Sequence, residues 1–267
     1  MKQTTERLAP DRTRTVEERV IDAMHRYAYT TVQEYAKPTD HLLEIGFGEG
    51  YGTEILEPWV AEYVGAEVER AAVAHAAEKY GRPRASFVHY DGVALPFDDA
   101  SFDVVIAFQV LEHVPDPEAF LREMQRVTRP GRCVLIVTPN RNHRVGDGER
   151  PWNRYHVREF SPVELDAVMR KVFDVVEVFG IHGSPDMNAI EKSRVARARK
   201  LARLDPLRLR YVLPEGLDTR LRTFLRRRRS APGLSASAES MIGVEHVRRA
   251  RDDVDDSLDL FAVGRAA

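Results

Sequence analysis

Short segments rich in β-forming residues alternate with helical stretches through the first half of this 267-residue chain. We expect strands at 41–45, 63–66, 85–90, 102–108 and 133–138. The intervening stretches with helical character are 51–56, 70–80 and 116–127, the last opened by Asp116 and Pro117. Because alternating strands and helices require crossover connections, the sequence predicts an α/β fold whose parallel sheet is covered by helices on both faces.

The segments outside this alternation extend the prediction to the whole chain. Apolar residues at helical spacing predict an amphipathic helix over 15–37, and a 22-residue irregular connection at 139–160 is typical of a lid or binding loop. A capping box at Ser161 begins a further helix, and 173–179 and 258–264 have strand character. We expect an N-terminal helical segment at 1–37, a core at 38–180, a helical insertion at 181–257, and a final core strand with its tail at 258–267.

Cysteine content and hydropathy set the class of protein. With 43% hydrophobic and 31% charged residues the chain can bury a core, which excludes disordered and collagen-like classes. Its single cysteine, Cys133, excludes an internal disulfide and a cysteine-based zinc site. No run of 18 apolar residues and no signal-like segment occurs. We therefore expect a soluble protein of the cytoplasm.

A glycine-rich turn between the first strand and the next helix points to a bound ligand. Gly46, Gly48 and Gly50 stand at alternate positions, which lets the backbone turn sharply and approach a ligand closely. The spacing is G-x-G-x-G, not the G-x-G-x-x-G of dinucleotide sites, and Glu44 precedes it. An acid there repels a pyrophosphate and attracts a cation. A turn with a purely structural role is the alternative.

Two more acids end the next two strands. Glu67 ends the second strand, where a carboxylate accepts hydrogen bonds from a ribose diol, and Asp91 with Gly92 ends the third, where a carboxylate and a backbone N–H suit an adenine edge. Each could be an ordinary surface acid. Three acids at successive carboxyl ends of parallel strands, where open α/β sheets bind ligands, favour a nucleoside site.

The motifs LEIGFGEGYG, YVGAEVE, HYDGVALPFDDASFDVVIAFQVLEHV and RVTRPGRCVLIVTPN resemble those of class I S-adenosylmethionine-dependent methyltransferases of the methyltransferase domain 11 type. The resemblance implies an enzyme with a Rossmann-like seven-stranded sheet, mostly parallel with an antiparallel last strand, plus a helical basic insertion before that strand. It also implies S-adenosyl-L-methionine as the cofactor. The family commonly has aspartate where Glu44 and Glu67 stand, so each carboxylate here reaches one methylene further.

Carried over by position, the resemblance assigns the parts of the cofactor. The methionyl part would contact Glu44, Gly46, Phe47, Gly48 and Gly50, the ribose Glu67 and Val68, the adenine Asp91, Gly92 and Val93, and the sulfonium would be flanked by Phe108, Gln109 and Val110.

Methylation of a hydroxyl requires a base, and three histidines qualify by position. His113 follows the fourth strand, while His143 and His156 lie in the connection after the fifth; each could instead be structural. The Asn/Asp-Pro-Pro-aromatic motif of adenine N-methylating relatives does not occur after the fourth strand, and Cys133 lies inside a predicted strand, which disfavours both nucleobase reactions. No spacing of acids indicates a metal site.

The stretch TPNRNHRVGDGERPWNRYHVREFSPVEL is similar to one in methyltransferases that act on sugars and polysaccharides. The similarity favours an O-methyltransferase for a sugar hydroxyl of an oligosaccharide or glycosylated metabolite, with His156 or His143 as the base. The acceptor would contact Asn140, Trp152, Asn153 and Tyr155. A lid packed only for stability is one alternative, and a small-molecule acceptor such as a quinone or polyketide is another.

Positive charge is concentrated late in the chain. Residues 191–230 hold 14 Lys/Arg against 4 Asp/Glu, including Arg226 to Arg229, whereas the whole chain has a net charge of −2. We interpret this basic segment as a solvated helix face; a homodimer contact and a surface that binds an acidic glycan carrier are the alternatives. An RNA-binding methyltransferase or a non-catalytic cofactor-binding protein is a further alternative, although we expect no nucleic-acid partner.

Overall fold

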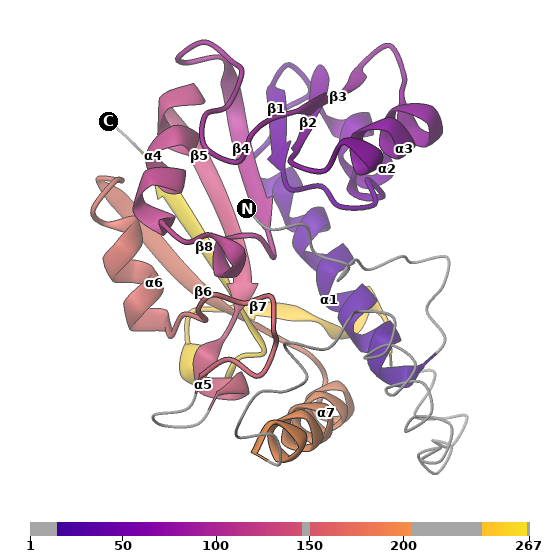
Figure 1. The fold of residues 1–267 in the computed structure, drawn as a ribbon, viewed down its shortest axis with the longest axis vertical. Helices are drawn as coiled ribbons and strands as arrows, with labels where there is room; N and C mark the ends of the chain where they lie inside the picture. Colours follow the sequence, from indigo (N-terminus) through magenta and orange to yellow (C-terminus); the bar gives the residue numbers. More distant parts are fainter. Residues whose placement is uncertain (1–14, 146–149, 204–241, 266–267) are drawn as a thin grey trace.

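The computed structural model describes residues 15–145, 150–203 and 242–265. Its centre is one eight-stranded sheet with the order β3-β2-β1-β4-β5-β8-β6-β7 (Figure 1). The strands are β1 (His41–Ile45), β2 (Glu62–Glu67), β3 (Ala85–His89), β4 (Phe102–Phe108), β5 (Thr128–Pro139), β6 (Val175–His182), β7 (Arg248–Ala250) and β8 (Asp259–Arg265). The α-helices are α1 (Val16–Thr31), α2 (Gly52–Leu56), α3 (Arg70–Tyr80), α4 (Pro117–Val127), α5 (Arg141–Arg144), α6 (Pro162–Met169) and α7 (Pro185–Arg203).

Short 3-10 helices complete the described elements. They are η2 (Val32–Glu34), η3 (Glu57–Trp59), η4 (Leu111–His113), η5 (Val244–His246) and η6 (Val254–Asp256). In this part of the chain no helix combines the length and the apolar character that crossing a membrane requires.

Strand direction fixes where a ligand can bind. The strands β1 to β5 pair in parallel, whereas β8 runs antiparallel to β5 and β6, and β7 runs antiparallel to β6. The carboxyl ends of β1 to β5 therefore meet at one edge of the sheet. All the acids and the glycine turn singled out in the sequence lie at this edge.

The expected seven strands are corrected to eight, while the antiparallel last strand, β8, is confirmed. The additional strand, β7, has only three residues, of sequence Arg-Arg-Ala, and it carries no apolar alternation by which a strand could be recognised. It lies inside the expected insertion at 181–257. The described part of that insertion holds α7, η5, β7 and η6, and the segments 226–229 and 230–237 lie outside the described residues.

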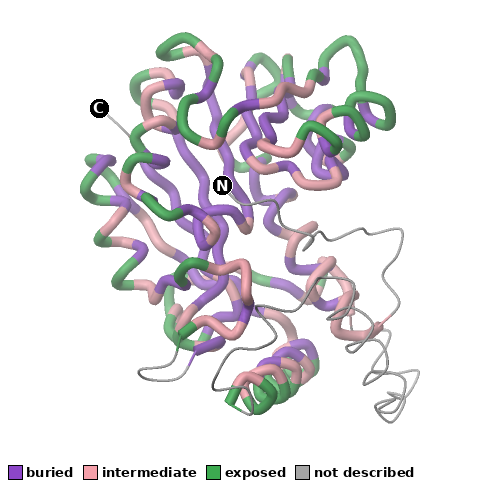
Figure 2. The backbone as a smooth tube through the Cα atoms, viewed as in Figure 1, coloured by how far each residue is buried: buried purple, intermediate pink, exposed green. Residues whose placement is uncertain are grey.

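Both faces of the sheet are covered, which explains why its strands are almost continuously apolar. Successive residues of a strand face opposite sides, so Leu42 joins the apolar cluster under α1, α3 and α7, and Leu43 joins the cluster under α4 and α6. Figure 2 shows the central strands buried between exposed helix surfaces. Thr15 with Glu18 and Ser161 with Glu164 form capping boxes at the starts of α1 and α6.

Candidate active site

The glycine turn joins β1 to α2 and requires a left-handed backbone. Gly46, Gly48 and Gly50 have φ angles of 76°, 59° and 81°. A Cβ on Gly46 would lie 2.5 Å from Cγ2 of Val110, so the turn packs directly against the end of β4. Among the described residues, no atom lies within 4 Å of a Cβ placed on Gly48. The turn is therefore closed towards the sheet and open on the side where a ligand would approach.

Glu67 lies beside this turn. Its Oε2 accepts a hydrogen bond from the backbone N–H of Gly48 at 3.2 Å, and its Oε1 accepts one from Val68 at 2.7 Å. The side chain is buried, with 6% of its residue surface exposed. The carboxylate is thus fixed next to the bare backbone, at the position that the resemblance assigns to the ribose hydroxyls.

Glu44 lies beneath the turn. Its two oxygens accept hydrogen bonds from the hydroxyls of Tyr29 at 2.6 Å and Tyr63 at 2.5 Å, and the residue is 1% exposed. Burial raises the pKa of Glu44 to about 7, because the low-dielectric surroundings disfavour the charged form more than the two hydroxyls favour it. Both oxygens thus already have partners inside the protein. The two tyrosines were not among the residues singled out from the sequence.

Asp91, Gly92 and Val93 form an exposed turn after β3. Oδ1 of Asp91 accepts hydrogen bonds from the N–H groups of Val93 at 2.8 Å and Ala94 at 3.0 Å, and these bonds lower the pKa of the carboxyl. The hydroxyl of neighbouring Tyr90 is buried, and no described residue bonds to it. Burial raises the pKa of Tyr90, which keeps the hydroxyl protonated as a donor.

The end of β4 is strained. Gln109 has a φ of 56°, uncommon for a residue with a side chain, and its N–H donates to the carbonyl of Val137 at 2.7 Å. Its side chain is hydrogen-bonded to Asp259, the first residue of β8, whose pKa is raised to about 6 by burial. The register that pairs Asp259 with Pro139 places this carboxylate at the same sheet edge. Asp259 is an acid that the sequence did not single out, because it begins a strand far along the chain.

These residues fit an adenosyl sulfonium. Gly48 presents bare backbone with open space above it, and Glu67 offers a fixed carboxylate beside it. Further along the same edge Asp91 offers an acceptor, and the hydroxyl of Tyr90, to which no described residue bonds, offers a donor. The phosphate-binding alternative lacks support here, because Glu44, Glu67 and Asp91 place acids at the ends of β1, β2 and β3.

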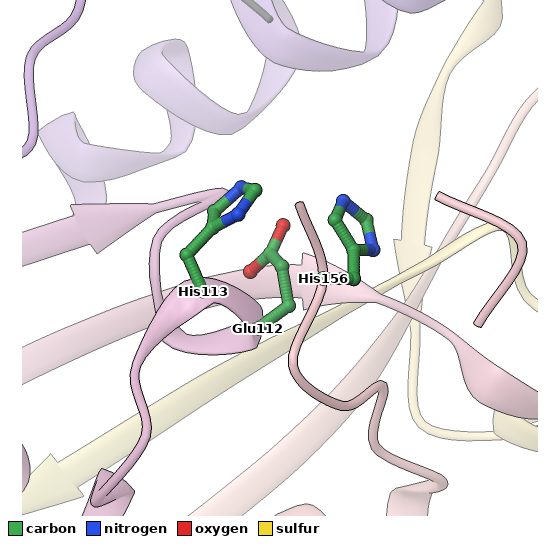
Figure 3. A group of neighbouring side chains, drawn as sticks. All are labelled: Glu112, His113 and His156. Carbon is green, nitrogen blue, oxygen red and sulfur yellow. The ribbon is translucent and has the colours of Figure 1, made fainter. Parts of the chain in front are cut away.

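Beyond the end of β4, three ionisable side chains gather. Ligand atoms of Glu112, His113 and His156 all lie within 4.8 Å of one another, and Figure 3 shows the Glu112 carboxylate between the two imidazoles. The imidazole rings are perpendicular, with centroids 4.8 Å apart. Glu112 and His113 come from η4, whereas His156 comes from the connection between β5 and α6. The structure therefore joins two of the three predicted histidines.

Hydrogen bonds fix each member of this cluster. Nδ1 of His113 lies 3.0 Å from the carbonyl oxygen of Tyr155, and Nδ1 of His156 lies 2.7 Å from Oε1 of Glu159. Oε2 of Glu112 accepts from the hydroxyl of Thr138 at 3.0 Å. Burial raises the pKa of Glu112 to about 8 and also raises that of Glu159.

The backbone fastens the connection to η4. The N–H groups of Val157 and Arg158 both donate to the carbonyl of Glu112, at 2.9 Å and 3.3 Å. Glu159, whose side chain is buried, forms an ion pair with Arg144 at 3.4 Å. Neither Glu159 nor Arg144 was singled out from the sequence, although Glu159 belongs to the HVREF stretch that carried the narrower resemblance.

His143 takes a different place. It lies on α5 and lines a groove of about 270 Å³ with Asn142, Lys192, Val195, Arg199 and Asp255. Its Nε2 is buried and bonded to no described residue, and burial lowers the pKa of the imidazole. His143 is not a member of the Glu112 cluster.

The four residues expected to contact the acceptor have partners within the protein. The Asn140 side-chain amide, fully buried, donates to carbonyls of η6 and Ser257, which ties the end of β5 to the segment before β8. Guanidinium groups of Arg144 and Arg194 lie over the Trp152 ring at 4.8 Å and 5.3 Å. The Asn153 side chain accepts from the backbone of Tyr155, whose carbonyl holds His113.

Comparison with known proteins supports the resemblance. Residues 43–136 match the family described as "Methyltransferase domain". The chain is 38% identical over 145 residues to a probable S-adenosylmethionine-dependent methyltransferase of Mycolicibacterium smegmatis, spanning 54% of this chain and 56% of that protein. It is 29% identical over 243 residues to one of Mycobacterium tuberculosis, spanning 90% of this chain and 81% of that protein.

A more distant relative and a solved structure extend the comparison. The tocopherol O-methyltransferase of Arabidopsis thaliana is 32% identical over 144 residues, spanning 51% of this chain and 41% of that protein. The crystal structure of the YcgJ protein of Bacillus subtilis shares the fold, with a TM-score of 0.55 at 17% identity over 91% of this chain and 99% of that one. The match over residues 43–136 and the named relatives show an S-adenosylmethionine-dependent methyltransferase with S-adenosylmethionine as its cofactor, and the solved structure shows the fold alone.

Proposed function

We propose that the chain transfers the methyl group of S-adenosylmethionine to a hydroxyl, with a sugar hydroxyl of an oligosaccharide or glycosylated metabolite as the acceptor. The cofactor supplies an electrophilic methyl group when bound. The observation that carries the proposal is the Glu112, His113 and His156 cluster directly after β4, the strand whose last residues would flank the sulfonium. A hydroxyl must lose a proton as its oxygen attacks, and groups positioned to handle a proton contribute about 10² to 10⁴ in rate.

The residues around this cluster support a polar acceptor. Arg144, Glu159 and Glu191 are buried, and Trp152 lies under two guanidinium groups. Buried charged groups are costly unless they are hydrogen-bonded, and a polyol has the density of donors and acceptors to exchange hydrogen bonds with them. An apolar acceptor would leave such groups with fewer partners.

A phenolic small molecule is the second candidate for the acceptor. The relative from Arabidopsis thaliana is named a tocopherol O-methyltransferase, which also implies methylation at oxygen. Such an acceptor needs the same removal of a proton but fewer polar contacts. The RNA-binding alternative depended on the basic segment 191–230, of which 191–203 belongs to α7 and the rest, with Arg226 to Arg229, lies outside the described residues.

The proposal is tested with S-adenosylmethionine carrying a deuterated methyl group. The protein is incubated separately with an oligosaccharide panel, with tocopherol-like phenols and with RNA, and products are located by mass spectrometry. We expect an O-methyl ether on a sugar, and at least a tenfold lower turnover for His156→Ala but not for His41→Ala, at the amino-terminal end of β1. Label on a nitrogen, or unchanged turnover of His156→Ala, would contradict the proposal.

A further inference from the structure

The Glu112, His113 and His156 cluster has the composition of a metal site. Two imidazoles and one carboxylate are the ligand set of many catalytic zinc sites and of two-histidine, one-carboxylate iron sites. The three residues come from two segments far apart in the sequence, which is why no spacing indicated them. The structure brings their ligand atoms within 4.8 Å.

The second layer of contacts is the stronger evidence. A metal-bound histidine almost always donates its other ring N–H to a carbonyl or carboxylate, which fixes the tautomer. A carbonyl can only accept, so the 3.0 Å contact with Tyr155 makes Nδ1 of His113 the protonated nitrogen. Glu159 stands in the same relation to Nδ1 of His156 at 2.7 Å. In both rings Nε2 then carries the lone pair that a metal requires.

Glu112 is held in the same manner. Oε2 of Glu112 accepts a hydrogen bond from the Thr138 hydroxyl at 3.0 Å. The backbone carbonyl of Glu112 accepts hydrogen bonds from the N–H groups of Val157 and Arg158, and these bonds place His156 next to Glu112. Figure 3 shows the carboxylate between the two rings. Tetrahedral zinc with bonds of about 2.1 Å holds its ligand atoms roughly 3.4 Å apart. A modest closing of the three side chains would therefore complete the geometry.

We propose that Glu112, His113 and His156 bind one divalent transition-metal ion, with Zn²⁺ as the favoured occupant. Three protein ligands leave a fourth position open, as in catalytic zinc sites. This inference deepens the proposed function, and its link to catalysis rests on that function: the open position would hold the acceptor hydroxyl and lower its pKa, so that its proton leaves to water and its oxygen takes the methyl group as the bond from that carbon to sulfur breaks. Nitrogen ligands disfavour Mg²⁺ and Ca²⁺, which prefer oxygen.

Metal binding is tested without any acceptor. The full chain is stripped with a chelator, desalted, and titrated with Zn²⁺ by calorimetry and with Co²⁺ by visible absorption. We expect one equivalent of each ion and a Co²⁺ spectrum of four- or five-coordinate type. Glu112→Gln and His156→Ala should weaken Zn²⁺ binding at least tenfold, whereas His41→Ala should bind as the unaltered chain does.

Two further measurements keep the test decisive. Calorimetry with the cofactor shows whether each variant is folded, and X-ray absorption of the Zn²⁺-loaded unaltered chain counts its imidazole ligands, for which we expect two. No binding by the unaltered chain, or a bound ion without imidazole ligands, would overturn the inference while methyl transfer could continue. Metal bound as expected without methylation of any hydroxyl would instead contradict the proposed function.

Discussion

Glu44 makes the stability of the protein depend on pH in a direction opposite to that of most carboxylates. Its side chain is buried under the glycine turn, and burial raises its pKa from 4.5 to about 7. The folded protein therefore binds this proton more tightly than the unfolded chain does. The contribution of Glu44 to stability is complete below pH 4.5 and is lost as the pH rises through about 7.

The magnitude follows from linkage. For one group with these two pKa values, the contribution to the free energy of unfolding falls by roughly 2 to 3 kcal/mol between about pH 5 and about pH 8. Glu44→Gln removes the titration while an amide can still bond with the hydroxyls of Tyr29 and Tyr63. Relative to the unaltered chain, the variant should therefore gain roughly 2 to 3 kcal/mol over this interval.

Urea unfolding at both pH values measures the difference. Glu54→Gln, a change of the same type at an exposed position of α2, is the matched control and should track the unaltered chain within about 0.5 kcal/mol. The reasoning is refuted if the Glu44→Gln difference stays constant with pH, because the carboxylate would then have the same proton affinity in the folded and unfolded chain.

Two more substitutions test the turn and the polar contacts of the sheet. Gly48→Val should raise the dissociation constant of the cofactor, measured by calorimetry, at least tenfold. The control is Gly131→Val: Gly131 lies in β5 with a φ of 72° and equally open surroundings among the described residues, so this change should lower the free energy of unfolding as much as Gly48→Val does and leave cofactor binding unchanged. Weakened binding in both variants would trace the loss to strain alone. Arg132→Ala should destabilise the chain by about 2 kcal/mol in urea unfolding, because it leaves the buried carboxylates of Asp40 and Asp103 without a shared ion-pair partner. Removing the exposed Arg122 should cost less than about 1 kcal/mol, and equal costs would contradict this account.

The local sequence pattern was sufficient to predict the bounds of elements whose residues are continuously buried in or against the sheet. The bounds of β1, β4 and α3 agree with the expected ranges, because apolar periodicity and sheet burial select the same residues. The start of β5 was missed, since 128–132 holds proline, glycine and two arginines beside the sheet. The three-residue β7 pairs only because β6 lies next to it. Its position follows from tertiary contact, which a single sequence does not display.

The site residues likewise fall into those that the sequence could predict and those that only the tertiary fold brings together. The glycine turn and Glu67 could be predicted because they follow one another along strand ends, which parallel pairing brings to one edge. The approach of His156 to within 4.8 Å of Glu112 and the placement of Asp259 beside Gln109 depend on how a long connection and the last strand return to that edge. Backbone bonds from Val157 to η4 set this return, and no periodicity records them.

A crystal structure with S-adenosylhomocysteine, the demethylated cofactor, tests the central claim most directly. The account predicts the ligand across the carboxyl ends of β1 to β4, with its ribose at Glu67, its adenine beside Asp91 and its sulfur near Gln109. Density for the ligand in the groove lined by His143 and Lys192, or a glycine turn left bare at a saturating concentration of ligand, would contradict it.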